Sequence, residues 1–227
     1  MARWVIAVVA ALLVAAAPPA VANPIDCAVV KCVALTFDDG PGPHTDRLLQ
    51  ILRDYDARAT FFLIGDKVAA DPAAARRVAD AGMEIGNHTW SHPDMTTLAP
   101  DQVAEQFHRA TTAIEAATGQ RPTLARTGGG HIDDVVLAEA GRQNLAVINW
   151  DVVPYDWMHD AATTRALLTQ QLRPNTVVLL HDTLGATVDV MAELVPKLRA
   201  DGYHLVTVSE LLGPRVPGAL YGARPPR

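Results

Sequence analysis

The chain has 227 residues, a length that suits one large α/β domain or two small ones, and 49% of them are hydrophobic, which is enough to bury a core. Its formal net charge of -6 excludes binding to nucleic acid through a general basic field.

Residues 1–22 have the pattern of a secretory signal peptide. The basic residue Arg3 precedes an apolar run at residues 4–17, and Ala20-Val21-Ala22 is a small-x-small cleavage site. The alternative is a single membrane anchor, but the run is short for a ~20-residue span and Pro18-Pro19 interrupts it. We therefore expect a secreted or cell-wall-associated protein with no stable membrane span after cleavage.

Two cysteines, Cys27 and Cys32, stand just before the first predicted strand. In an exported chain they are expected to form a small disulfide loop. Two free thiols that bind a metal are the weaker interpretation, because export favours oxidation.

Strand-like and helix-like stretches alternate along the mature chain. Apolar runs predict strands at residues 33–37, 59–64, 83–87, 123–126, 145–149, 176–180 and 204–208. Amphipathic periodicity and capping residues predict helices at about 44–55, 72–81, 100–118, 134–141, 161–172 and 186–200.

This alternation has no break in composition, which predicts one α/β domain at residues 23–212 with a parallel sheet of about seven strands. A closed or nearly closed barrel is favoured over an open doubly wound sheet, although the pattern alone does not separate them. Residues 213–227 are rich in Pro, Gly and Arg and are expected to be an irregular tail.

Titratable side chains gather where the predicted strands end. In a parallel βα fold, the C-terminal ends of all the strands point to one face, which is where such folds place their active sites. We weight this clustering more than any single motif. The residues concerned are Asp38, Asp39, His88, His92, Arg126, Asp151, Asp156, His181 and Asp182.

Two of these groups have the composition of a metal site. Adjacent carboxylates at Asp38 and Asp39 are costly to bury unless a positive charge joins them. His88 and His92 lie four residues apart, and Pro93 disfavours a helix there, so both are expected on a loop. Two histidines and one carboxylate form a metal site with open positions, for which zinc is the default. The same ligand set suits the Fe(II) of non-haem oxygenases, but the βα alternation counts against that class.

Four motifs together resemble those of a known family. They are Thr36-Phe37-Asp38-Asp39-Gly40-Pro41, His88-Thr89-Trp90-Ser91-His92, Trp150…Asp156-Trp157 and Leu179-Leu180-His181-Asp182. The chain resembles the polysaccharide deacetylases of the NodB-homology class, carbohydrate esterase family 4, over about residues 32–212. The resemblance implies a distorted (β/α) barrel, which agrees with the seven predicted strands.

The resemblance also implies roles for the charged residues. Asp39, His88 and His92 would bind the metal, Zn²⁺ or another divalent ion such as Co²⁺. Asp38 would be the general base that takes a proton from metal-bound water, and His181 the general acid that protonates the leaving amine.

Supporting roles follow in the same way. Arg126 matches the arginine that holds and tunes the base, and Asp156 matches the aspartate that pairs with the acid histidine. Trp157 and Leu180 match apolar residues that shape the groove around the acetyl methyl group.

The chain departs from the family pattern at two positions. The family usually has Arg-x-Pro-Tyr after the fourth strand, where this chain has Arg126-Thr127-Gly128-Gly129-Gly130. The resemblance implies that the backbone N–H at the family's Tyr position stabilises the oxyanion, and this position falls at Gly129, in a loop that three glycines leave less preorganised. The second departure is Val153, where relatives often carry an additional Asp.

The leading hypothesis is a secreted, metal-dependent deacetylase that hydrolyses N-acetyl groups of a cell-wall or chitin-type polysaccharide. An O-acetyl esterase acting on an acetylxylan-like substrate and a non-catalytic, metal-binding wall protein are the alternatives. In the two enzymatic readings the partner is an acetylated polysaccharide or oligosaccharide, and no pattern in one chain determines the oligomeric state.

Overall fold

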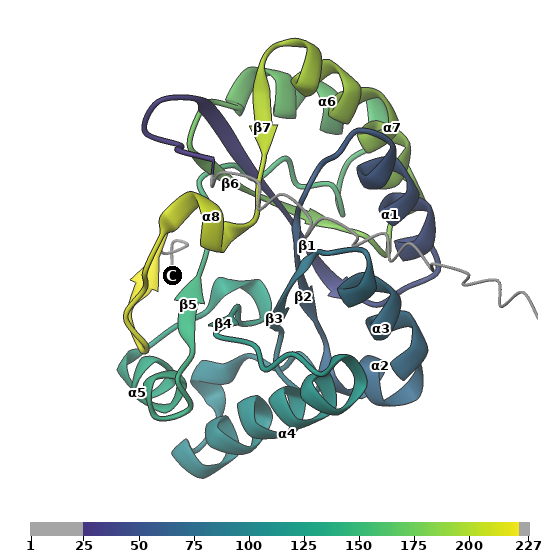
Figure 1. Ribbon diagram of the computed structural model, residues 1–227. Helices are drawn as coiled ribbons and strands as arrows, with labels where there is room; N and C mark the ends of the chain where they lie inside the picture. The colour runs from purple at the N-terminus through teal and green to yellow at the C-terminus, as the bar shows by residue number, and fades with distance from the viewer. Residues whose placement is uncertain (1–24, 223–227) are drawn as a thin grey trace, which may run out of the picture.

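A computed structural model describes residues 25–222, which form a curved parallel sheet surrounded by helices (Figure 1). The signal peptide predicted at residues 1–22 lies outside the described residues. The strands are β1 (Lys31–Gly40), β2 (Thr60–Leu63), β3 (Glu84–Asn87), β4 (Leu124–Ala125), β5 (Ala146–Ile148), β6 (Thr176–His181), β7 (Tyr203–Leu205) and β8 (Leu220–Tyr221). The α-helices are α1 (Thr45–Asp54), α2 (Gly65–Ala70), α3 (Pro72–Asp80), α4 (Pro100–Thr118), α5 (Asp134–Arg142), α6 (Ala161–Gln171), α7 (Gly185–Ala200) and α8 (Val208–Leu212), and the 3₁₀ turns are η1 (Met95–Thr97) and η2 (Gly128–Gly130).

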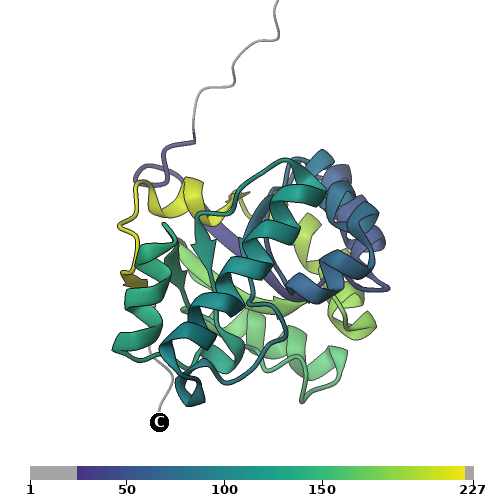
Figure 2. The same cartoon turned by 90° about the horizontal axis from the view of Figure 1, so that it is seen from below.

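The sheet of the described chain has the strand order β6-β1-β2-β3-β4-β5-β8, with β7 paired to the start of β1, and its pairings are parallel. Helices lie around the outside of the sheet in both views (Figures 1 and 2). Val152, in the irregular segment after β5, bridges to Val178 of β6 and nearly closes the curl. The expected distorted (β/α) barrel is therefore confirmed.

The core occupies both sides of the strands. Between the sheet and helices α1, α3 and α7, side chains such as Leu35, Phe37 and Val195 are fully buried. A smaller inner cluster that includes Ala34 and Phe62 lies with Val208 of α8. Because both faces of the strands are buried, they read as continuous apolar runs in the sequence rather than as alternating ones.

Local signals placed several helix ends correctly. Side-chain carboxylates cap three helices by accepting from backbone N–H groups: Asp71 from Ala74, Asp133 from Val136 and Asp160 from Thr163. Asp133 therefore caps α5. Helix α4 ends at Gly119, whose φ of 75° is the left-handed conformation expected of a C-terminal glycine.

The end of the chain differs from the sequence-based expectation. The strand expected at 204–208 is shorter, because β7 ends at Leu205 and α8 begins at Val208. Thr207 and Glu210 form a capping box that starts this short helix. Residues 220–221 of the expected irregular tail form β8, which extends the sheet beside β5. Helix α2 was also not predicted.

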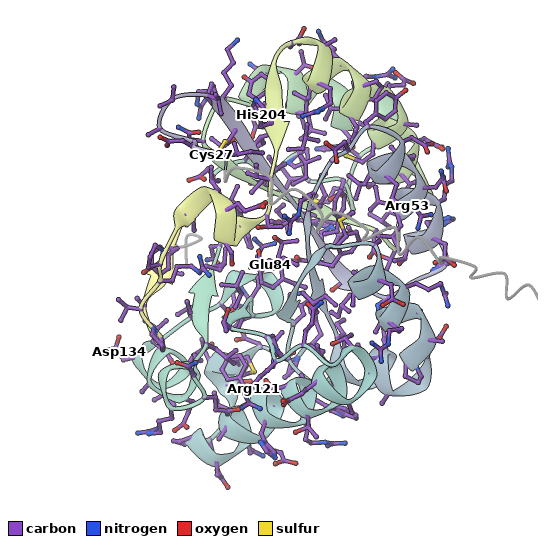
Figure 3. All side chains as sticks on the ribbon, in the orientation of Figure 1. Cys27, Arg53, Glu84, Arg121, Asp134 and His204 are labelled. Carbon is purple, nitrogen blue, oxygen red and sulfur yellow. A yellow bond between two sulfur atoms is a disulfide. The ribbon has the colours of Figure 1, made fainter. Side chains whose placement is uncertain are left out.

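A disulfide joins Cys27 to Cys32, as the sequence predicted. Cys32 lies in β1 and pairs with His204 of β7, so the disulfide ties the N-terminal turn to the first strand (Figure 3). None of the helices within residues 25–222 is long and apolar enough to cross a membrane.

Candidate active site

The two adjacent carboxylates lie near the C-terminal end of β1. Asp38 pairs with Phe62 of β2 and with His181 of β6, and the register then shifts before Gly40. Asp39 takes a φ of 69° at this irregularity. Neighbours in a regular strand point to opposite faces, so this bulge allows both carboxylates to face one cavity.

The loop that carries His88 and His92 is held by hydrogen bonds to α4. Asn87 donates to the carbonyl of Phe107 and to Thr111, while its own oxygen accepts from the N–H of Thr89. Left-handed backbone at Thr89 and His92 brings the centroids of the His88 and His92 rings to 4.8 Å from each other.

Gln106 of α4 also supports this loop, since its side-chain oxygen accepts from the N–H groups of Trp90 and Ser91. The sequence analysis assigned no role to Gln106, because nothing in a helical pattern marks a glutamine that binds a distant loop.

The geometry of Asp39, His88 and His92 fits a divalent metal. Their ligand atoms all lie within 4.8 Å of one another. Among residues 25–222, no other group of this kind contains both histidines. Asp39 Oδ1 is buried without a hydrogen-bond partner and lies 3.3 Å from His88 Nε2 and 3.5 Å from His92 Nε2. A buried carboxylate oxygen between two imidazole nitrogens is what a cation requires.

The protonation states of the histidines also suit a metal. His88 Nδ1 donates to the carbonyl of Arg126 at 2.8 Å, which leaves the lone pair of Nε2 directed at the carboxylates. Burial and the neighbouring His88 lower the pKa of His92, which favours the neutral imidazole that metal binding needs.

Arg126 is fully buried and holds Asp38 in place. Its Nη1 donates to Asp38 Oδ1 at 2.8 Å and to Thr36 Oγ1 at 2.7 Å, and the guanidinium lies 4.2 Å from the ring centroid of Phe62. The carboxylate that the sequence predicted as the base is therefore fixed in orientation beside a buried cation.

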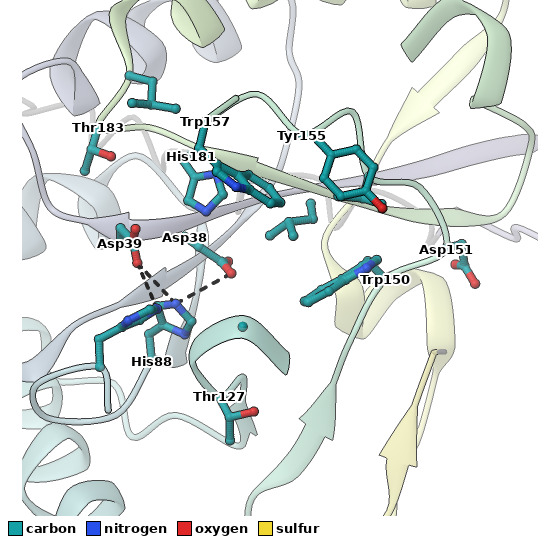
Figure 4. Close-up of a pocket in the computed structure, with 15 residues that line it drawn as sticks. Asp38, Asp39, His88, Thr127, Trp150, Asp151, Tyr155, Trp157, His181 and Thr183 are labelled. Atoms are coloured by element: carbon teal, nitrogen blue, oxygen red, sulfur yellow. Dashed lines mark ion pairs between the residues drawn. The ribbon is translucent and has the colours of Figure 1, made fainter. Parts of the chain in front are cut away.

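His181 lies on the opposite side of the same cavity from His88 (Figure 4). Its Nδ1 donates to Asp156 Oδ1 at 2.9 Å, and Asp156 Oδ2 accepts from the His181 N–H and from Thr187 Oγ1. Burial acts to lower the pKa of His181, but the hydrogen bond and charge of Asp156 outweigh it and raise the pKa. A raised pKa favours the protonated ring, and His181 lines the cavity.

The cavity has a volume of about 780 Å³, and its wall contains most of the predicted site residues. Gly129 and Trp157 line it, as expected. Leu180 does not, and this expectation is wrong: Leu180 is buried in the core, while Leu179 lines the cavity. Residues two apart in a strand share a face, so Leu179 accompanies His181.

The glycine loop after Arg126 has a defined geometry. Gly129 takes a φ of 60°, a conformation that favours glycine, and the N–H groups of Gly130 and His131 close the turn onto Thr127 and Gly128. Thr127 Oγ1 donates to the carbonyl of His131, which further holds the loop.

His131 Nδ1 also lies 3.0 Å from Asp94 Oδ2. A side chain at Gly128 would place its Cβ 3.0 Å from the ring of His92, so this glycine allows the loop to pack directly on a metal-ligand candidate.

Asp182 follows His181 but faces away from the cavity. It is fully buried against Gly40, whose added Cβ would lie 2.8 Å from the carboxylate, and Thr45 Oγ1 donates to it. Burial raises the pKa of Asp182 to about 7 despite this hydrogen bond.

Comparison with known proteins identifies the family to which the chain is similar. The sequence pattern described as polysaccharide deacetylase matches residues 26–148. The chain is 38% identical over 183 residues to the peptidoglycan-N-acetylmuramic acid deacetylase PdaC of Bacillus subtilis, covering 80% of this chain and 38% of PdaC, so it spans less than half of that relative. A peptidoglycan-N-acetylglucosamine deacetylase of Bacillus cereus is 36% identical, with 80% of this chain and 88% of the relative covered.

A solved structure described as T48 deacetylase with substrate superposes with a TM-score of 0.82 at 37% identity, over 87% of this chain and 100% of that one. Sequence pattern, relatives and structure therefore agree, and the chain belongs to the polysaccharide deacetylases of the NodB-homology class, carbohydrate esterase family 4.

Proposed function

We propose that this protein is a metal-dependent deacetylase that hydrolyses N-acetyl groups of a cell-wall or chitin-type polysaccharide. The observation that carries the proposal is the placement of two hydrogen-bonded pairs at one cavity: Asp38 with Arg126, and His181 with Asp156. The names of the relatives, which are peptidoglycan deacetylases, support the substrate class.

A divalent metal held by Asp39, His88 and His92 would act as a Lewis acid and lower the pKa of a water molecule, so that the deprotonated water could attack an amide near neutral pH. Zn²⁺ is our first choice and Co²⁺ the second, because two imidazoles and one carboxylate leave open positions for water and substrate. The buried, otherwise unpaired Asp39 Oδ1 supports this ligand set.

The chain's own residues would manage the protons. Asp38 accepts a proton as water adds to the amide carbon, and its orientation is fixed by Arg126. The N–H of Gly129 is the candidate donor to the carbonyl oxygen as negative charge develops there. His181 then donates a proton to the amide nitrogen as the C–N bond breaks, which releases acetate and leaves a free amine on the sugar.

We also propose that residues 1–22 direct export, so that the domain works at the cell wall. The positive charge of Arg3, the apolar run and the Ala20-Val21-Ala22 cleavage site support this proposal. The disulfide between Cys27 and Cys32 fits an oxidising compartment. N-terminal sequencing of the protein recovered from the culture medium or wall fraction tests it, and an intact Met1 would contradict it.

Acetate release by the purified protein tests the reaction. The protein is stripped of metal, resupplied with Zn²⁺ or Co²⁺, and offered chitin oligomers, peptidoglycan and acetylxylan beside the Asp38→Asn variant. Metal-dependent release from the first two that vanishes in the variant supports the proposal. Release from acetylxylan alone favours the O-acetyl esterase.

Binding of metal is measured separately, as a rise in Tm when Zn²⁺ is added, with His88→Ala as the control. Metal binding without acetate release from any polymer would favour the non-catalytic wall protein, and the glycine loop would then be the first suspect.

A further inference from the structure

Two large aromatic side chains stand exposed at the rim of the cavity. Tyr155 and Trp157 lie in the segment between β5 and α6, and these residues are 45% and 48% exposed. The ring centroids of Tyr155 and Trp157 are 5.4 Å apart, and those of Trp157 and His181 are 5.1 Å apart. Figure 4 shows Trp157 between His181 and Tyr155. The rings thus form a row that leads outward from the reacting centre.

Tyr155 adopts a backbone conformation that a bulky residue avoids. Its φ is 53°, in the left-handed region, which is strained for a bulky non-glycine residue. Asn or Gly would accept this conformation more easily. Since Tyr155 remains about half exposed, burial of its ring does not offset the strain of its backbone conformation.

The conformation is held by its neighbours. Asp156 is anchored by three hydrogen bonds, from the His181 N–H, His181 Nδ1 and Thr187 Oγ1, and the N–H of Met158 donates to the carbonyl of Tyr155 at 2.9 Å. The segment that positions Asp156 behind His181 therefore also turns Tyr155 outward. Its ring packs edge-on against that of Trp157.

We propose that the Tyr155 ring forms an outer sugar subsite, on which the pyranose next to the deacetylated one stacks. This inference rests on the proposed function, because His181 defines where the reacting amide lies. Pyranose rings have a flat face of C–H groups that packs on an aromatic ring, while their hydroxyl groups need polar partners at the edge. Asp151 also lines the cavity; its Oδ2 accepts from the N–H of Val177, and its other carboxylate oxygen can accept from such hydroxyls (Figure 4).

The position of Tyr155 indicates which sugar of the substrate it would contact. Two successive ring contacts separate His181 from Tyr155, so the tyrosine lies beyond the sugar that carries the reacting amide. Trp157, next to His181, belongs to the reacting sugar itself. Tyr155 therefore distinguishes a chain of sugars from a single one, and its contribution should grow when the substrate is longer than one ring.

The test compares Tyr155→Asn with Tyr155→Phe. Asn accepts a left-handed φ but removes the ring, whereas Phe keeps the ring and the strain. With a tetramer of N-acetylglucosamine, we expect Tyr155→Asn to raise KM about tenfold with kcat unchanged, and Tyr155→Phe to behave as wild type. With the monomer, all three proteins should be alike. Tyr155→Asn should also have a Tm no lower than wild type, which excludes misfolding as the cause.

Tetramer binding is measured calorimetrically as well, in an Asp38→Asn background that does not turn the substrate over. A tetramer Kd unaffected by Tyr155→Asn would overturn the subsite. An equal loss on monomer and tetramer would also overturn it, because the residue would then act only through Asp156 and His181. If wild type releases no acetate but the tetramer Kd still depends on the Tyr155 ring, the proposed reaction fails while the subsite stands.

Discussion

Replacing Arg126 with Met should destabilise the protein strongly, because it leaves a buried carboxylate without its counter-ion. Arg126 is completely buried and makes four hydrogen bonds through its guanidinium. Nε donates to the Ile148 carbonyl at 2.8 Å, Nη2 to the Asn149 carbonyl at 3.1 Å, and Nη1 to Thr36 Oγ1 and Asp38 Oδ1.

The magnitude follows from the charge rather than from the packing. Met keeps an apolar side chain of similar length against Phe62, so the loss of contact is small. Removing one partner of a buried ion pair costs about 3–5 kcal/mol, because the other charge stays buried. In a domain of this size each kcal/mol lowers Tm by about 2–4 °C, so we expect Tm to fall by about 6–20 °C.

The assay is urea denaturation of metal-free protein, so that metal binding does not add to the stability. Asp38→Asn is measured alone and together with Arg126→Met. The double variant should lose less than the sum of the single losses, since a neutral amide needs no counter-ion. The control is Arg121→Met, which breaks an exposed pair with Glu115 and should cost less than about 1 kcal/mol.

Two results would refute the reasoning. One is a cost for Arg126→Met no greater than that for Arg121→Met. The other is strict additivity with Asp38→Asn, because Arg126 would then stabilise the fold by packing and not by pairing with the base.

Three further predictions test the site. Burial lowers the pKa of His181 and Asp156 raises it by more, so Asp156→Asn should lower that pKa and move the basic limb of kcat against pH to lower pH, because the donor must be protonated. Gly128→Ala should weaken Zn²⁺ binding in calorimetry by about tenfold through its contact with His92, with the Tm of the metal-free protein little changed. Burial raises the pKa of Asp182 to about 7, above an unfolded value near 3.9, so the wild type should lose stability as pH rises from about 4 to 7. Asp182→Asn cannot ionise, and its urea midpoint, measured without metal, should not show that loss; parallel pH profiles for the two proteins would count against the assignment.

Local sequence was sufficient where the deciding contact is local. Asp71, Asp133 and Asp160 cap helices through hydrogen bonds to an N–H three residues ahead, so their positions could be read from the chain. The capping box of Thr207 and Glu210 carries the same kind of signal, and it was missed because the preceding apolar alternation resembles a strand. Leu180 was misplaced although the period of two in β6 pairs Leu179 with His181.

The sequence by itself also determined the composition of the site. Parallel strands deliver their C-terminal ends to one face, so Asp38, Asp39, His88, His92 and His181 were expected together before any contact was known. The pairing of β8 with β5 carried no comparable signal, because a two-residue strand is defined only by its neighbour.

Tertiary structure decided where the side chains point. The positive φ of Asp39 turns its carboxylate into the cavity beside Asp38, and that of Tyr155 turns an aromatic ring out to the rim. A positive φ is unfavourable for a bulky residue such as Tyr155, and aspartate adopts it only as a minor conformation. Each is imposed by contacts from distant parts of the chain, β2 and β6 around Asp39 and the hydrogen bonds to Asp156 beside Tyr155, and such contacts exist only once the barrel has formed.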